Sequence, residues 1–239
     1  MSLKPRNLTE QLVETLGQRI VSGDYPIGGK LPSEQFFGAE FDVSRPILRE
    51  VTKVLMAKGL VESRSRVGTT VRARENWSML DPDVLRWTIQ SLPEQAFIDF
   101  LFDTRMVYEP GAAALAAKNA SEEDLVRIRS AYDAMKEADT ASDLMDPDLE
   151  FHQAIVDATQ NPFLAHIGRT LYNALKYSIE LTSRHPHTHD LSLPRHKAVC
   201  DAILNRDNAK AAQAMQVLLE ESRDDFLHVA GTAAKGRAR

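Results

Sequence analysis

Residues 30–72, KLPSEQFFGAEFDVSRPILREVTKVLMAKGLVESRSRVGTTVR, decide the fold of the first third of the chain. Ser33 and Ser44 each stand before a short helix-prone run, where a serine hydroxyl can accept a hydrogen bond from a free backbone N–H group. In the second run, apolar residues recur at helical spacing from Ile47 onward, and Gly59 supplies a stop. The stretch therefore predicts two short helices joined by a tight turn.

The remainder of this stretch predicts a β-hairpin with a basic tip, known as a wing. Two short β-prone runs, residues 60–62 and 69–72, flank the sequence SRSRVG. Arg45 and Arg49 lie one turn apart on the second helix, and an arginine in a major groove can hold guanine through two parallel hydrogen bonds. Exposed arginines more often merely face solvent. Their combination with a wing, which can lie on phosphates, favours DNA binding.

The motifs LPSE, VSR, LRE and GTTV, in this order, resemble the DNA-binding domain of the GntR family of bacterial transcription regulators. The family usually places a basic residue after the SE pair, where this chain has Gln35, so one of the family's DNA contacts is in doubt here. The resemblance implies double-stranded operator DNA as a partner. We expect the DNA contacts to come from the second, recognition helix and from the wing, through Ser44, Arg45, Pro46, Arg49, Arg66 and Gly68.

Composition and charge divide the chain in two. With 43% hydrophobic and 26% charged residues, the 239-residue chain has an ordinary globular composition. Residues 1–75 carry 12 Lys and Arg against 9 Asp and Glu, whereas the remainder carries 17 against 25. A basic first third on an acidic remainder is typical of a DNA-binding module joined to a sensing or dimerising domain. The chain shows no membrane-spanning run or signal segment and has a single cysteine, Cys200, so we expect a cytoplasmic protein.

The fold class we predict is mainly α. After Pro93 the apolar period is helical throughout, which indicates a helical bundle, and this part resembles the FCD effector domain of the FadR branch of the GntR family. We expect a break at residues 184–194, where His185, His187 and His189 alternate; a polar loop is the better interpretation of that cluster than a binding site. The expected domains are a winged helix-turn-helix domain at 1–75, a linker and connecting helix at 76–92, an all-helical effector-binding and dimerisation domain at 93–230, and a disordered tail at 231–239.

The bundle contains one candidate metal site. Asp148 and His152 stand four residues apart and therefore share a helix face, although such a pair is commonly a solvated or core contact. The family resemblance implies that both, together with His196, bind a divalent metal ion such as zinc, nickel or manganese. Metal-binding relatives have a further histidine on the last helix, where this chain has Leu218. Three protein ligands still suffice if water or an anion completes the coordination; Cys200, one turn after His196, is more often a small core residue.

Arg105 is the first candidate for binding an effector. It lies in an otherwise apolar helical stretch, where a buried guanidinium needs a partner: either Glu109, four residues later, or a carboxylate of a ligand. The family's R-x-x-x-E signature favours the ligand. Arg223, Asn173 and Tyr177 are further candidates, which together would suit a small carboxylate with hydroxyl groups, such as a sugar acid.

Together these features predict a ligand-responsive repressor of a catabolic operon. We expect a homodimer, because one recognition helix reads only a few base pairs and twofold symmetry doubles the contacts. The run WSMLDPDVLRW and Leu218 resemble the galactonate type of sugar-acid repressors. The alternative is a metal-dependent enzyme acting on a small organic acid; no nucleophile and base stand near Asp148 in the sequence, and the winged segment would then be unexplained.

Overall fold

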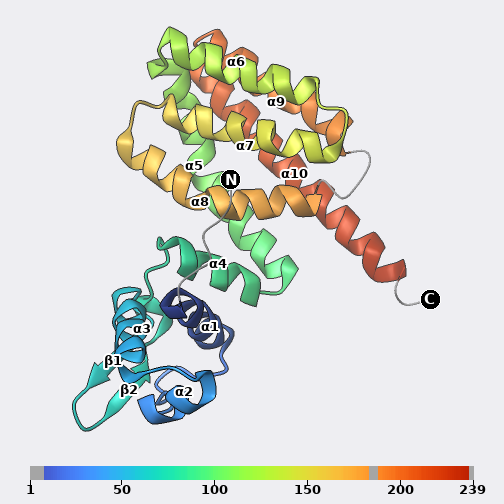
Figure 1. Ribbon diagram of the computed structural model, residues 1–239. Helices are drawn as coiled ribbons and strands as arrows, with labels where there is room; N and C mark the ends of the chain where they lie inside the picture. Colours follow the sequence, from blue (N-terminus) through green and yellow to red (C-terminus); the bar gives the residue numbers. More distant parts are fainter. Residues whose placement is uncertain (1–7, 183–187, 237–239) are drawn as a thin grey trace. The chain divides into compact units, whose positions relative to one another are not determined.

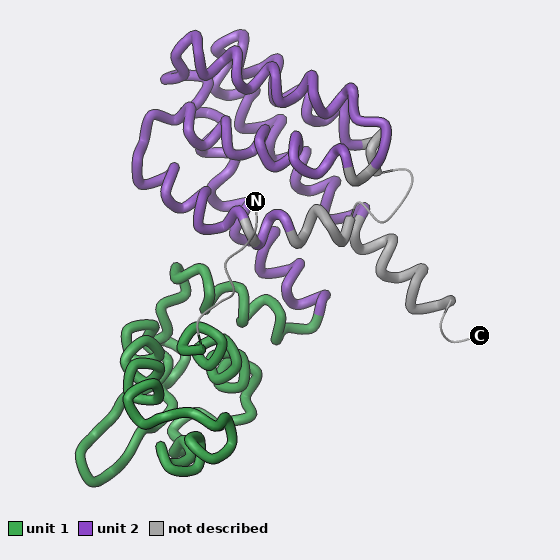
Figure 2. The backbone as a smooth tube through the Cα atoms, viewed as in Figure 1, with its two compact units in different colours: residues 1–93 green, residues 94–239 purple. Residues whose placement is uncertain are grey.

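The computed structural model describes residues 8–182 and 188–236, and it divides into two compact units, residues 1–93 and 94–239 (Figure 2). Unit 1 is a small helical domain with one hairpin, and the described part of unit 2 is helical, which confirms the predicted fold class (Figure 1). The elements of unit 1 are α1 (Leu8–Ser22), α2 (Glu34–Phe41), α3 (Arg45–Ala57), β1 (Val61–Arg64), β2 (Gly68–Val71), the 3-10 turn η1 (Arg74–Asn76) and α4 (Pro82–Ser91).

The turn between α2 and α3 is built by the residues on either side of it. The hydroxyl of Ser33 accepts a hydrogen bond from Phe36 N at 3.2 Å, as the sequence predicts for a capping serine. Asp42 ends α2 in the left-handed region, with φ of 52°. Ser44 occupies the predicted N-cap position of α3, although its side chain makes no capping hydrogen bond. Pro46 in the first turn fixes φ there and needs no partner for a backbone N–H.

The wing is a two-stranded antiparallel hairpin. β1 and β2 pair in a register that runs from Val61 opposite Val71 to Arg64 opposite Gly68. An isolated bridge between Lys30 and Thr70 adds a short third segment beside it. Val61 and Val71 are buried, so the base of the hairpin is anchored in the core of unit 1 while its tip is exposed.

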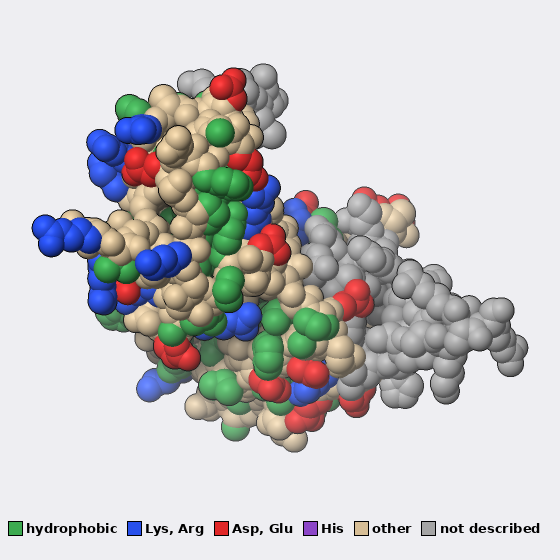
Figure 3. All heavy atoms as spheres, turned by 90° about the horizontal axis from the view of Figure 1, so that it is seen from below, with side chains coloured by type: hydrophobic (Ala, Val, Ile, Leu, Met, Phe, Trp, Pro, Cys, Tyr) green, Lys and Arg blue, Asp and Glu red, His purple; other side chains and the backbone are tan. Residues whose placement is uncertain are grey.

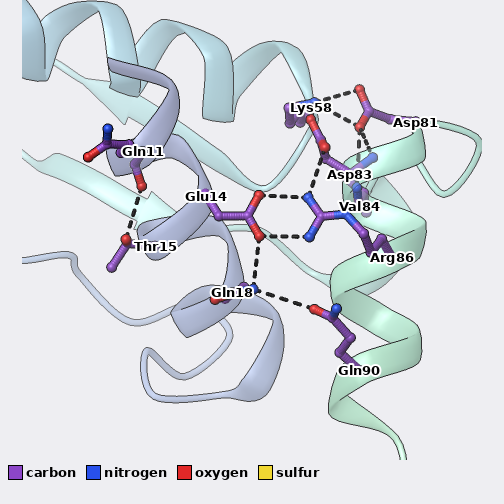
Figure 4. A network of polar contacts seen from close by, with 10 residues as sticks. All are labelled: Gln11, Glu14, Thr15, Gln18, Lys58, Asp81, Asp83, Val84, Arg86 and Gln90. Atoms are coloured by element: carbon purple, nitrogen blue, oxygen red, sulfur yellow. Dashed lines mark hydrogen bonds and ion pairs between the residues drawn. The ribbon is translucent and has the colours of Figure 1, made fainter. Parts of the chain in front are cut away.

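Helix α4 packs within unit 1. Trp87 is 1% exposed, and its ring lies on the bare backbone of α1, since a Cβ added at Gly17 would come within 2.3 Å of that ring. Arg86 also donates to both carboxylate oxygens of Glu14, at 2.7 and 2.6 Å (Figure 4). The helix that we placed in a linker region is therefore part of the core of the winged unit, because Trp87 finds its apolar partner on α1.

Ion pairs also join α4 to the end of the recognition helix. Lys58, the residue that ends α3, donates to Asp81 at 2.8 Å and to Asp83 at 2.9 Å (Figure 4). Asp81 caps α4 by accepting from the backbone N–H groups of Asp83 and Val84. The same short segment thus begins α4 and holds the C-terminal end of α3.

Unit 2 is a bundle around a large hydrophobic core, and Leu149 and Leu175 form a smaller separate cluster. Its helices are α5 (Glu94–Asn119), α6 (Glu122–Lys136), α7 (Ala141–Asp157), α8 (Pro162–Thr182), α9 (Thr188–Leu204) and α10 (Asn208–Gly236). Cys200 is 2% exposed within this core, and burial raises the pKa of its thiol to about 11, so it is a core residue. Within the described residues, no helix is both long and apolar enough to cross a membrane.

Two boundaries in unit 2 differ from our expectations. Helix α9 begins at Thr188, so the expected break is shorter; Pro194 lies inside the helix, where a proline forfeits one backbone hydrogen bond without always ending the helix. Helix α10 continues to Gly236, through part of the expected tail, because its last turns contain alanines, the strongest helix formers. His185 and His187, and the side chain of His189, lie outside the described residues.

Candidate DNA-binding face and metal centre

The recognition helix α3 presents a polar face to solvent. Its opposite face is buried through Leu48, Val51 and Leu55, so the helix is fixed by its apolar side. The predicted DNA contacts at its start, Ser44, Arg45, Pro46 and Arg49, are all exposed. Arg49 makes only a loose ion pair, with Nε 3.8 Å from Glu34 Oε2, and its guanidinium therefore remains accessible to a partner.

The wing extends the same basic surface. Arg66 lies at the tip, in the left-handed region with φ of 65°, and Gly68 begins β2 with φ of 99°, a conformation that favours glycine. Both residues are exposed. Figure 3 shows Lys and Arg side chains gathered on the left of the view, the side toward which the wing projects in Figure 1. Recognition helix and wing thus present cations together, as phosphate and base contacts require.

The candidate metal centre lies inside unit 2. α7 supplies Asp148 and His152 and α9 supplies His196, and one ligand atom from each lies within 4.8 Å of the others. All three residues are at most 9% exposed. Leu218, where metal-binding relatives have a histidine, is packed in the hydrophobic core. The structure therefore brings together the three predicted ligands. Among the described residues, they form a cluster of the kind that could hold a metal ion.

The orientation of both imidazoles fits a metal site. His196 Nδ1 lies 2.9 Å from the carbonyl oxygen of Ser192. His152 Nδ1 lies 2.9 Å from Glu109 Oε2, but the angle of this contact is not that of a hydrogen bond. Each Nε2 consequently faces Asp148 Oδ1, at 3.3 Å for His152 and 3.4 Å for His196. Metal-bound histidines typically use one nitrogen for the ion and the other for an oxygen of a neighbouring residue.

The spacing of these atoms also fits an ion. Ligand atoms placed about 2.0–2.1 Å from a tetrahedral zinc ion are about 3.3 Å apart. This is close to the 3.3 and 3.4 Å that separate Asp148 Oδ1 from the two Nε2 atoms. Within the described residues, Asp148 Oδ1 and His196 Nε2 are buried without a hydrogen-bond partner. Since unsatisfied buried polar atoms are costly, a cation that binds both would relieve that cost.

The charges of the cluster favour a cation. Burial would raise the pKa of Asp148, but the neighbouring imidazoles of His152 and His196 hold that pKa well below its usual range. Burial also opposes ionisation of Glu109, yet Arg105 and His152 lower its pKa to about 2. Both carboxylates are therefore ionised at neutral pH.

The protonation of His152 follows from its two neighbours. Burial lowers the pKa of His152, but the carboxylates of Glu109 and Asp148 together outweigh this effect and raise it. Arg105 Nη2, however, lies 3.1 Å from His152 Nε2, and a guanidinium can only donate, so Nε2 has to be unprotonated. We therefore assign a neutral ring with its proton on Nδ1. That proton faces the Glu109 carboxylate, and the lone pair on Nε2 faces the Arg105 guanidinium.

The predicted effector residues have different surroundings. Arg105 is 5% exposed and donates through Nε to Glu109 Oε1 at 2.6 Å, so the structure contains the ion pair that the sequence offered as the alternative to ligand binding. Arg223 is held on the outer side of α5 by Asp99 and Asp103, at 2.8 and 3.0 Å. The side chains of the other two candidates, Asn173 and Tyr177 on α8, lie outside the described residues.

Sequence reasoning missed the role of Glu109 toward the metal ligands. Its spacing from Arg105 is visible as a four-residue step on one helix, but its contact with His152 joins α5 to α7 and has no local signal. The contact of His196 with Ser192 could have been found, since the two residues also stand four apart.

An exposed basic helix and wing, joined in one chain to a helical domain with a buried metal-type cluster, define a class of protein: a DNA-binding transcriptional regulator with a second, helical domain. Residues 8–71 match the family described as bacterial regulatory proteins, gntR family, and residues 100–221 match the FCD domain. The chain belongs to the GntR family, in the FadR branch that carries an FCD domain.

Relatives that match about 90% of the chain are transcriptional regulators as well. The chain is 33% identical over 222 residues to the galactonate operon transcriptional repressor of Escherichia coli (strain K12), covering 90% of this chain and 95% of that protein. It is 35% identical over 219 residues to the HTH-type transcriptional regulator YieP of the same organism, covering 90% and 93%. These relatives favour a regulator over the alternative of a metal-dependent enzyme.

A solved structure shows the same fold. The chain from work titled "Lar controls the expression of the Listeria monocytogenes agr system and mediates virulence" superposes with a TM-score of 0.61, covering 95% of this chain and 99% of that chain. At 17% identity, this likeness concerns the fold alone.

Proposed function

We propose that this regulator represses a catabolic operon and responds to a small carboxylate, such as a sugar acid, which binds beside a divalent metal ion in the helical domain. One observation carries the proposal: two histidines and an aspartate face one another in the core of unit 2, with an arginine beside them. Similarity to the galactonate operon repressor, and to the Exu regulon transcriptional regulator of Escherichia coli (strain K12), 28% identical over 235 residues, supports sugar acids as the effector class.

In this proposal Asp148, His152 and His196 hold the metal through one oxygen and two nitrogen atoms. When bound, the ion supplies positive charge and open coordination positions that a carboxylate or hydroxyl oxygen can take. Leu218 offers no ligand atom, which leaves one more position to the effector or to water. Arg105, beside the cluster, supplies a second cationic group for the same carboxylate.

The other proposed effector contacts have less evidence behind them. Asn173 and Tyr177 stay proposed as hydroxyl-binding residues on α8. Arg223 would have to leave Asp99 and Asp103 before it could bind an effector, so its ion pairs speak against that role.

The DNA half of the proposal uses the exposed face of α3 and the wing. Residues 1–75 read the operator and residues 93–230 sense the effector and dimerise, so that two winged domains meet the two halves of a near-palindrome. We propose the cytoplasm as the place of action, because the operator is there. The proposed DNA contacts are Ser44, Arg45, Pro46, Arg49, Arg66 and Gly68.

The effector proposal is tested by thermal shift of the zinc-loaded protein with a panel of aldonic and uronic acids, alongside a search for reaction products. Stabilisation by an acid without turnover supports a sensor, and product formation would refute it. His152→Ala is expected to abolish metal uptake in elemental analysis, whereas His166→Ala, an exposed histidine of α8, serves as the control and keeps the metal. Equal metal content in both variants would place the ion elsewhere.

A further inference from the structure

Arg105 lies next to the proposed metal ligands, where it would compete with a metal ion for His152. Its side chain reaches from α5 to α7, and Nη2 lies 3.1 Å from His152 Nε2. That nitrogen is the one that faces Asp148 Oδ1, at 3.3 Å, and is therefore the atom available for an ion. Arg105 and His152 are each 5% exposed, so water does not replace either contact easily.

The contact between Arg105 and His152 excludes a metal ion at the same nitrogen. A neutral imidazole has a single lone pair, on Nε2 when the proton is on Nδ1. That lone pair either accepts a hydrogen bond from the guanidinium or binds the ion. A divalent cation at bonding distance from Nε2 would also stand next to the guanidinium charge in a buried site, where like charges repel strongly.

Glu109 allows the guanidinium to give up this contact without losing its counterion. Arg105 Nε donates to Glu109 Oε1 at 2.6 Å, and Nη2 lies 3.3 Å from Glu109 Oε2. The pair with Glu109 uses Nε in addition to Nη2, whereas the contact with His152 uses Nη2 alone. Nη2 can therefore leave His152 while Nε stays bound to the carboxylate.

We propose that Arg105 acts as an internal stand-in for the metal ion: it hydrogen-bonds His152 in the metal-free protein, leaves that nitrogen when the ion binds, and is then free to hold the carboxylate of an effector. This inference rests on the proposed metal-dependent function. Metal and carboxylate then bind with positive coupling, because the first releases the donor that the second uses, and such coupling is reciprocal.

The first test measures zinc affinity by competition with a chelating dye, using Zn²⁺ alone. Arg105→Gln removes the competing cation and is expected to bind zinc about 10- to 100-fold more tightly than the natural protein, the range expected for one hydrogen bond to a charged group. The control is Arg169→Gln, which removes an exposed guanidinium of α8 and is expected to leave zinc affinity unchanged. Its partner, Asp157, lies on α7, the helix that carries Asp148 and His152.

The second test needs no variant. In protein labelled with ¹⁵N-arginine, the Nη protons of Arg105 are expected to exchange faster with solvent when Zn²⁺ is added, while the Nε proton, bound to Glu109, stays protected. If Arg105→Gln binds zinc more tightly but the Nη exchange in the natural protein is unchanged, the effect is general electrostatics and the stand-in role is refuted.

The two proposals fail in different ways. If neither the natural protein nor Arg105→Gln binds zinc, the metal-dependent function itself is wrong, and the stand-in role falls with it. If both bind zinc equally and the arginine signals do not change, the metal function stands and only the role of Arg105 is refuted.

Discussion

Replacement of Glu109 by glutamine tests the buried charges around the candidate metal centre. Glu109 is 1% exposed, and its carboxylate contacts Arg105 Nε at 2.6 Å and His152 Nδ1 at 2.9 Å. Glutamine keeps the size but removes the charge, which leaves the guanidinium buried without its main counterion. Such a loss typically costs about 3–5 kcal/mol of unfolding free energy. Asp148 also attracts Arg105, so we expect the lower end, about 3 kcal/mol.

The assay is urea unfolding of metal-free protein at neutral pH, followed by far-ultraviolet circular dichroism. Both tryptophans, Trp77 and Trp87, belong to unit 1, so helical dichroism is the better signal for the bundle. With a denaturant slope of about 2 kcal/mol per molar urea, Glu109→Gln should lower the midpoint by about 1.5 M. Glu150→Gln is the control: its partner contact with Arg127 is exposed, and such a pair contributes at most about 1 kcal/mol.

A double variant completes the test. Arg105→Met combined with Glu109→Leu removes both charges and fills the space with apolar atoms, so it is expected to lose less stability than Glu109→Gln alone. If Glu109→Gln costs no more than Glu150→Gln, or if the double variant is the less stable one, the buried pair does not have the energetic role that we assign to it.

Three further predictions concern unit 1. Arg49→Ala is expected to weaken specific operator binding by about 1–3 kcal/mol in gel-shift titrations, and an equal loss on random DNA would make Arg49 a phosphate contact. Gly17→Ala is expected to destabilise unit 1 by about 1–3 kcal/mol in tryptophan-fluorescence unfolding, because the added Cβ would lie 2.3 Å from the Trp87 ring; an unchanged midpoint would show that α4 can shift. Partial burial tends to raise the pKa of Asp83, but hydrogen bonds from Lys58 and Arg86 lower it. The ionised Asp83 carboxylate therefore stabilises the fold above the usual aspartate pKa of about 3.9, and this stabilisation is lost as pH falls through the lowered pKa. The stability difference between the natural protein and Asp83→Asn should therefore shrink from about pH 5 to about pH 3 in urea titrations, and a constant difference would contradict this.

Features that depend on neighbours in the sequence could be predicted well. The capping hydroxyl of Ser33 and the hairpin after α3 follow from short motifs, and the long helix Glu94–Asn119 follows from its apolar period. Pro194 was misleading, because a proline inside a helix costs one hydrogen bond and the remaining contacts can outweigh it.

Features that depend on distant residues could not be predicted. Gly17 gives no sign in the sequence that an indole ring will lie on it, because that ring comes from Trp87, 70 residues later. The same applies to the contact of Glu109 with His152. The ligand set itself could be predicted only because the family resemblance added His196 to a weak local pair.

The burial of Cys200 makes this protein convenient for spectroscopic labelling. Thiol reagents react with the thiolate, and with a pKa of about 11 and 2% exposure this thiol is essentially unreactive at neutral pH. A cysteine introduced at an exposed position, such as Val67 at the tip of the wing or Val126 on α6, would therefore carry a spin label or fluorophore without mutation of the natural cysteine. Distances measured between such labels, with and without a sugar acid, would report directly whether units 1 and 2 respond to it.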